Sequence, residues 1–265
     1  MKIKDGRVVA RENEVRVLRA LHRCGWLRTR DLSVVVWQEW ARNPQGEPDL
    51  RPPTPTDSGL RMAQRTLQRL RANRQVLSSR APDGSQIYAL AEAGARRLQQ
   101  IGVAALSGKD LMRTFSAAYF KHRCIANQIA IAAIVQGFRV ATEREIAQGL
   151  WLGGQDGIAG KRPDVLVRAD GRVWWLEVER SRKNAKDYSR LLHWLGIVGQ
   201  DALRPSESRL LEAGMRWAKV IFICTAAFRG KLLRDLAVAG WDKAQIDRLV
   251  MFEVSLYKFE DITFK

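Results

Sequence analysis

The segment at residues 161–180, KRPDVLVRADGRVWWLEVER, constrains the fold most strongly, because it has the pattern of a complete β-hairpin. The Asp-Gly pair at 170–171 supplies the positive backbone dihedral angles that a tight hairpin turn requires. Side chains alternate between the two faces of a strand, so Trp175, Glu177 and Glu179 share one face. The tryptophan, leucine and valine between them share the other face. Both tryptophans sit mid-strand beside apolar neighbours, and we expect them in the core.

Three acidic side chains come together in this hairpin. Asp164 stands at the start of the first strand, and Glu177 and Glu179 stand near the end of the second. Neighbouring carboxylates repel each other unless a positive charge lies between them. A divalent cation with oxygen ligands would remove that repulsion, so we expect Mg²⁺ or Mn²⁺ between these acids.

The chain is strongly basic along its whole length. Its 265 residues include 45 Lys and Arg and 28 Asp and Glu, a formal net charge of +17. Residues 1–112 carry 20 basic and 11 acidic groups (+9), and residues 113–265 carry 25 and 17 (+8). Because the excess is not confined to a tail, we expect a polyanionic partner, nucleic acid rather than membrane. A generic basic surface is the alternative.

Other signals concern the compartment. The N-terminus is polar, no apolar run approaches the ~18 residues that a membrane helix needs, and we expect no signal peptide. The three cysteines, Cys24, Cys124 and Cys224, lie far apart without a CxxC pair. Reduced thiols and a cytoplasmic location are therefore expected.

The first part of the chain predicts three helices followed by a β-hairpin. Apolar spacing predicts a helix over 12–23 that Gly25 ends, and a second helix begins at Thr29 or Arg30. Residues 43–58 hold five of the eight prolines and are expected to form an irregular insertion. A third helix follows, and then a hairpin over 75–90. This is the order of a winged helix-turn-helix domain.

The third helix separates into an apolar and a basic face. Leu60, Ala63, Leu67 and Leu70 fall on one side at about 100° per residue. Arginine and glutamine can pair with guanine and adenine edges, and arginine also binds phosphate. A solvated amphipathic helix is the alternative to DNA contact. The predicted DNA-binding residues, including one in the hairpin, are Arg61, Gln64, Arg65, Gln68, Arg69 and Arg80.

The second part predicts a mixed sheet covered by helices. A long helix over 113–136 precedes a short strand at 138–141, the hairpin described above, and a helix over 184–198. Residues 217–225, WAKVIFICT, read as a strand buried on both faces. The fold class is therefore α/β (α+β), with an N-terminal winged helix-turn-helix domain at 1–110 and an α/β domain at 111–265.

The spacing of Pro163-Asp164 and Glu177-Val178-Glu179 resembles the PD-(D/E)xK nuclease superfamily. The resemblance implies that Asp164 and Glu177 ligate magnesium and that a lysine, normally at position 179, acts on the attacking water. Here position 179 is glutamate, which is compatible either with a Glu-x-Glu nuclease or with a relative that no longer cleaves. Lys183 is the candidate for a migrated lysine. Glu143, with Glu145 in reserve, is the candidate for an upstream acid.

The whole chain is similar to the replication-relaxation family of bacterial plasmids and integrative elements, over roughly residues 10–255. The matching parts are YALAEAGARRL, HRCIANQIAI and RPDVLV with WWLEVERS. The resemblance implies a mobile-element protein with double-stranded DNA as partner, and the sequence allows a homodimer. We expect a Mg²⁺-dependent DNA endonuclease. The alternatives are a non-catalytic regulator or a replication or relaxosome accessory factor on a degenerate nuclease fold, and an RNA-binding protein.

Overall fold

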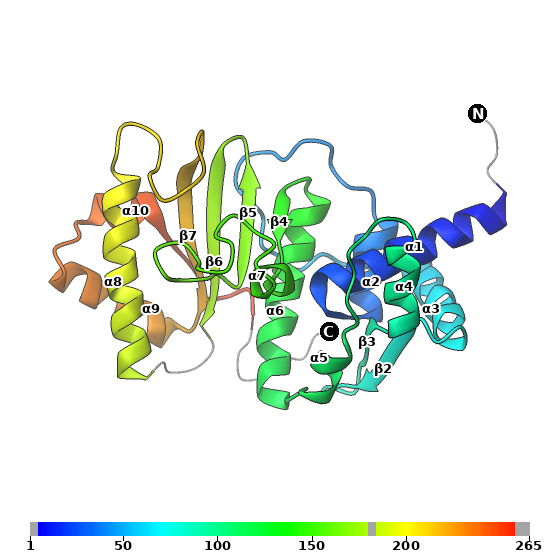
Figure 1. Ribbon diagram of the computed structural model, residues 1–265. Helices are drawn as coiled ribbons and strands as arrows, with labels where there is room; N and C mark the ends of the chain where they lie inside the picture. The colour runs from blue at the N-terminus through cyan, green and yellow to red at the C-terminus, as the bar shows by residue number, and fades with distance from the viewer. Residues whose placement is uncertain (1–4, 180–183, 258–265) are drawn as a thin grey trace. The chain divides into compact units, whose positions relative to one another are not determined.

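The computed structural model describes residues 5–179 and 184–257, which form two compact units of mixed α/β structure (Figure 1). The first unit combines the described residues up to Arg42 with Pro52–Gly137, and the second combines Asn43–Arg51 with the described residues from Phe138 onward. Helices and two separate sheets confirm the predicted α+β class. Within the described ranges, no helix has the length and apolar character needed to cross a membrane.

The first unit is helical around a small antiparallel sheet with the strand order β1-β3-β2. Strand β1 follows Gly25 directly and pairs Trp26 with Ala89 of β3. It was not predicted, whereas the β2–β3 hairpin was predicted and is confirmed. The elements are α1 (Gly6–Cys24), β1 (Trp26–Arg28), α2 (Thr29–Trp37), α3 (Asp57–Ala72), β2 (Val76–Arg80), β3 (Gln86–Leu90), α4 (Glu92–Gln99), α5 (Lys109–Arg113) and α6 (Ala117–Val135).

The second unit contains a five-stranded mixed sheet with the order β4-β5-β6-β7-β8. Its first three strands are antiparallel neighbours, and β6, β7 and β8 run parallel. Helices α8, α9 and α10 connect the parallel strands and lie on one side of the sheet (Figure 1). The elements are β4 (Arg139–Ala141), α7 (Glu143–Ala147), β5 (Val165–Ala169), β6 (Arg172–Glu179), α8 (Ala185–Ala202), β7 (Arg216–Cys224), α9 (Ala226–Val238), α10 (Lys243–Leu249) and β8 (Val250–Glu253).

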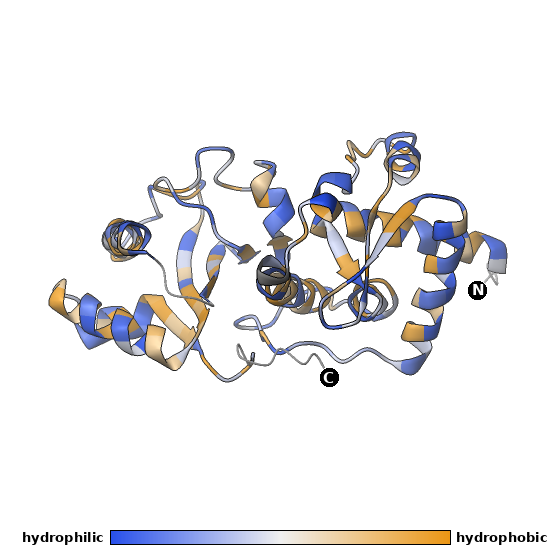
Figure 2. Cartoon of the chain, turned by 90° about the horizontal axis from the view of Figure 1, so that it is seen from below, coloured by the Kyte–Doolittle hydropathy of each residue, from blue (hydrophilic) through white to orange (hydrophobic). Residues whose placement is uncertain are grey.

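The predicted hairpin is confirmed as β5–β6. Asp170 and Gly171 form its turn with φ angles of 49° and 70°. Trp174 and Trp175 are both fully buried, on opposite faces of β6, as expected for core residues. On the face covered by α8, the rings of Trp175 and Trp194 lie 4.5 Å apart. Hydrophobic and hydrophilic residues alternate along several helices (Figure 2), and in α8 the buried residues Leu191, Trp194, Leu195 and Val198 recur at helical spacing on the side that faces the core.

The units do not follow the boundary that the sequence predicts after residue 110. Helix α6 packs with the first unit, where Asn127 Nδ2 donates to the carbonyl of Trp26 at 2.9 Å. Residues 43–51 of the proline-rich insertion belong to the second unit, where Tyr257 Oη donates to the carbonyl of Leu50. The insertion is irregular up to Thr56, which caps α3.

Candidate functional sites

Helix α3 presents a basic face to solvent. It begins at a threonine cap, where Thr56 Oγ1 accepts the N–H of Gly59 at 3.1 Å. Ala63, Leu67 and Leu70 are buried, as the helical period predicts. The side chains exposed on the opposite side are Arg61, Gln64, Arg65 and Gln68. No hydrogen bond or ion pair joins these four side chains to another residue in the part of the chain that the structure describes.

Arg69 differs from the other predicted DNA-binding residues because its guanidinium is held within the unit. Its Nε lies 3.2 Å from Glu14 Oε1, and its Nη2 lies 3.2 Å from Thr66 Oγ1. The other oxygen of Glu14 accepts from Arg97 Nη1 at 2.9 Å. Glu14 thus links α1 to both α3 and α4. Arg69 is 44 % exposed, but part of its hydrogen-bonding capacity is used inside the protein.

Arg80 is exposed at the end of β2, beside the turn that joins β2 to β3. This turn lies near the start of α2, since Asp83 Oδ2 is 3.9 Å from the buried guanidinium of Arg28. Arg28 in turn donates from Nε and Nη2 to the two oxygens of Asp31, both at 2.9 Å. A bidentate pair of this kind fixes the orientation of both side chains. The hairpin that carries Arg80 is therefore tied to the helical part of its unit.

The hairpin β5–β6 brings Asp164 beside the end of β6. Asp164 precedes β5, and its N–H donates to the carbonyl of Leu176 at 3.0 Å. Its side chain bends across the ladder, so that Oδ2 accepts the N–H of Val178 at 2.7 Å. Asp164 thus lies at the same end of the β5–β6 pair as Glu177 and Glu179, as the hairpin predicts.

One carboxylate oxygen of Glu177 is held by two side chains. Glu177 is only 4 % exposed, and its Oε1 accepts from the indole Nε1 of Trp175 at 2.6 Å. The ammonium of Lys161 lies 2.5 Å from the same oxygen. Burial raises the pKa of the Glu177 carboxyl above its ordinary value; Lys161 lowers it, and the charges of Asp164 and Glu179 raise it further. The three acids therefore interact electrostatically, as expected from the sequence.

Glu179 is also buried, at the last position of β6, where it pairs in register with Cys224 of β7. Burial raises the pKa of the Cys224 thiol to about 12, and the charge of Glu179 raises it as well. The Glu179 side chain points to the same face of the sheet as Glu177, because the two residues are two positions apart along the strand.

The upstream acids have different positions. Glu143 is the first residue of α7, two residues after β4 ends at Ala141, which pairs with Leu166 of β5. Glu145 instead caps its own helix, since its Oε2 accepts the N–H of Thr142 at 2.9 Å in a capping box. Lys183, the predicted migrated lysine, lies outside the described residues.

Lys161 is a site residue that the sequence prediction missed. It stands three residues before Asp164, and its side chain is 21 % exposed beside Glu177. Arg162 and Pro163 lie between it and Asp164. A basic residue close to the Pro163-Asp164 motif could have indicated a partner for the acids. The direction of the Lys161 side chain, however, depends on the fold of the loop before β5.

The acids suit a hard cation chemically, but their arrangement does not fit one. Carboxylate oxygens are the ligands that Mg²⁺ prefers. However, Glu177 Oε1 is already occupied by an ammonium and an indole, and Asp164 Oδ2 by a backbone N–H. Across residues 5–179 and 184–257, no three Asp, Glu, His or Cys side chains form a group that could hold a metal ion.

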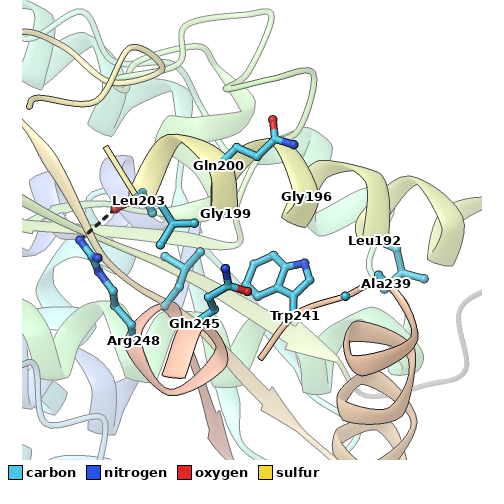
Figure 3. A pocket seen from close by; sticks show the side chains of 12 residues that line it. Leu192, Gly196, Gly199, Gln200, Leu203, Ala239, Trp241, Gln245 and Arg248 are labelled. Atoms are coloured by element: carbon cyan, nitrogen blue, oxygen red, sulfur yellow. Dashed lines mark hydrogen bonds between the residues drawn. The ribbon is translucent and has the colours of Figure 1, made fainter. Parts of the chain in front are cut away.

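A separate hollow in the second unit has no acid among the described residues that line it. It has a volume of about 260 Å³ and lies between the C-terminal half of α8 and the segment from Ala239 to Leu249 (Figure 3). Trp241 packs directly on Gly199, and Arg248 Nη2 donates to the carbonyl of Ala202 at 3.1 Å. The C-terminal half of α8 leads to the start of β7, whereas the acids lie where β5 begins and β6 ends, and β6 runs parallel to β7. The hollow is therefore not part of the acid cluster.

Comparisons of the chain with models of protein families, with curated proteins and with solved structures gave no match.

Proposed function

We propose that the chain binds double-stranded DNA through the exposed face of α3. The observation that carries the proposal is the set Arg61, Gln64, Arg65 and Gln68 on one side of a well-packed helix. Arginine and glutamine are suited to bidentate contacts with base edges and to phosphate contacts. The net charge of +17 adds a general attraction for a polyanion.

The topology of the first unit supports the same proposal. The order α1-β1-α2-α3-β2-β3 with the sheet order β1-β3-β2 is compatible with a winged helix-turn-helix domain, in which α3 would be the recognition helix and β2–β3 the wing. Arg80 would then lie in the wing. A helix enters the major groove of B-form DNA, whereas the major groove of A-form RNA is too narrow, which favours DNA over RNA.

Loss of two α3 arginines tests the proposal. The double variant Arg61→Ala with Arg65→Ala should bind a fluorescently labelled duplex at least about tenfold more weakly, since each charged contact contributes on the order of 1 kcal/mol or more. A matched control, Arg190→Ala with Arg209→Ala, removes the same charge from exposed positions of the second unit. Equal losses in both double variants would leave only non-specific charge and would exclude α3 as the interface.

Phosphodiester cleavage is a second candidate function. The observation in its favour is that Asp164, Glu177 and Glu179 meet at one edge of a mixed sheet, as in the predicted PD-(D/E)xK domain. Incubation of supercoiled plasmid with Mg²⁺ or Mn²⁺ would then produce nicked or linear DNA, and Glu177→Ala would abolish this without weakening DNA binding. Equal nicking by the variant would point to a contaminating nuclease and exclude this candidate.

We also propose that the chain acts as part of a bacterial mobile genetic element. The residues that support it are those of the YALAEAGARRL segment, which in the structure form the end of β3 and α4. Gly94 in this segment lies against the carbonyl of Gln75, and Ala91 caps the helix without a side-chain hydrogen bond. A DNA-binding protein that takes part in plasmid replication or relaxosome assembly is consistent with both units.

A further inference from the structure

We propose that the Lys161 ammonium occupies the position of a bound cation at Glu177 Oε1. The ammonium supplies the positive charge for the acid cluster of Asp164, Glu177 and Glu179, and it prevents a divalent metal ion from binding to this oxygen. The inference competes with the second candidate function, which requires a metal ion at these acids, and it does not depend on DNA binding. It starts from one contact, the 2.5 Å separation between Lys161 Nζ and Glu177 Oε1.

The loop before β5 is built to hold Lys161 in this position. Its backbone forms a two-way bridge with Ile158, in which Ile158 N donates to the Lys161 carbonyl at 2.9 Å and Lys161 N donates back at 3.2 Å. The Ile158 carbonyl also accepts from the indole of Trp194 at 2.9 Å. Gly157 has φ +81°, and a Cβ there would lie 2.4 Å from the Lys161 carbonyl oxygen. The loop therefore closes only with glycine at this position.

The surroundings of the ammonium favour a cation. Lys161 Nζ lies 5.8 Å from the ring centroid of Trp175 and 5.6 Å from that of Trp194, within the range of cation–π attraction. Glu177, whose charge interacts with those of Asp164 and Glu179, supplies the negative charge. Two aromatic faces and a carboxylate thus surround one ammonium. Aromatic rings of this kind would not ligate a magnesium ion, which requires oxygen ligands.

The position of Lys161 also explains how the chain accommodates glutamate at position 179. Two buried glutamates beside a partly exposed aspartate would repel one another strongly without a positive partner. Lys161 provides the positive charge. It precedes Asp164 in the sequence, whereas position 179, where the lysine of the PD-(D/E)xK pattern is expected, follows Asp164. A divalent ion at Glu177 Oε1 would have to displace this ammonium or bind beside it, and either carries an electrostatic cost.

Terbium luminescence tests the inference. Tb³⁺ binds to oxygen-rich sites for hard cations and emits when a nearby tryptophan is excited, and the Trp175 indole hydrogen-bonds to Glu177. The wild-type chain should give weak sensitised emission that does not depend on Glu177. Lys161→Met should raise the apparent affinity for Tb³⁺ by at least about tenfold, because it removes a like charge next to the ion. Adding Glu177→Gln to Lys161→Met should abolish the gain.

Lys231→Met is the matched control. Lys231 Nζ also pairs with an acid, Asp235 Oδ2 at 2.6 Å, and lies 3.5 Å from the ring centroid of Tyr188, but no further acid among the described residues interacts with that pair. This variant should gain no Tb³⁺ binding. A gain equal to that of Lys161→Met would overturn the inference, because it would show that loss of any lysine raises lanthanide binding.

A second measurement does not need the Lys161 variant to fold. Mn²⁺ or Tb³⁺ is titrated into the wild-type chain and into Glu177→Gln. Equal binding supports the inference, and a marked loss in Glu177→Gln overturns it, since the metal would then use the oxygen assigned to Lys161. DNA affinity measured on the same samples is expected to be unchanged, so failure here is distinct from failure of the DNA-binding proposal.

Discussion

Replacing Lys161 by methionine should destabilise the second unit in a pH-dependent way. The substitution keeps the length of the apolar stem and removes the ammonium that contacts Glu177. Removing one partner of a fully buried ion pair costs about 3–5 kcal/mol. Because the Lys161 side chain is 21 % exposed and water can partly replace it, we expect a smaller loss at neutral pH, about 2 kcal/mol.

The sign of the pH dependence follows from the pKa of Glu177. Burial already raises this pKa above the ordinary value of 4.5, and loss of Lys161 removes the group that lowers it. Between the unfolded and folded pKa values, the folded variant binds more protons than the unfolded chain, so its stability falls as pH rises. The difference between variant and wild type should therefore be small near pH 4.5 and grow toward neutral pH.

Urea unfolding followed by tryptophan fluorescence measures this difference at pH 5 and pH 7.5. The double variant Lys161→Met with Glu177→Gln should lose the extra pH dependence, because the amide carries no charge. A loss of the same size at both pH values would refute the electrostatic reasoning. So would an unchanged pH dependence in the double variant.

Two further predictions concern packing and thiol reactivity. Gly94→Ala should lower the free energy of unfolding by about 1–3 kcal/mol, because the new Cβ would lie 2.3 Å from the Gln75 carbonyl oxygen. Gly6→Ala is the control, since its Cβ meets open space and should not destabilise the protein. Equal melting temperatures for the two variants would contradict this prediction. Burial and the charge of Glu179 raise the pKa of the Cys224 thiol to about 12, so this thiol should resist alkylation at pH 8 until the chain is unfolded in urea. Rapid labelling of Cys224 in the folded chain would contradict this prediction and would show that the end of β7 is open to solvent.

Features encoded by neighbouring residues were predictable from the sequence. The β5–β6 hairpin depends on an Asp-Gly turn and on alternation within a few residues, and both are visible in the sequence. The two faces of α3 follow from helical periodicity alone, and burial of Ala63, Leu67 and Leu70 confirms them. In both cases the deciding interactions are local.

Features that depend on distant partners were not predictable. Strand β1 has three residues, too few to show a period, and exists because β3 pairs with it more than fifty residues later. Lys161 reaches Glu177 only through the closed loop that Gly157 and Ile158 form. The tie between Arg69 and Glu14 likewise joins two helices, so the sequence showed a free basic side chain where the structure shows one that is partly engaged.

The salt dependence of DNA binding tests the central proposal most directly. Each phosphate contact releases condensed counterions and contributes about −0.9 to the slope of log Kobs against log salt concentration. If Arg61 and Arg65 both contact phosphates, their double alanine variant should have a slope that is shallower than that of the wild type by about 1.8. The control Arg190→Ala with Arg209→Ala should keep the wild-type slope. An unchanged slope in the α3 variant would contradict the proposal that this helix lies on the DNA.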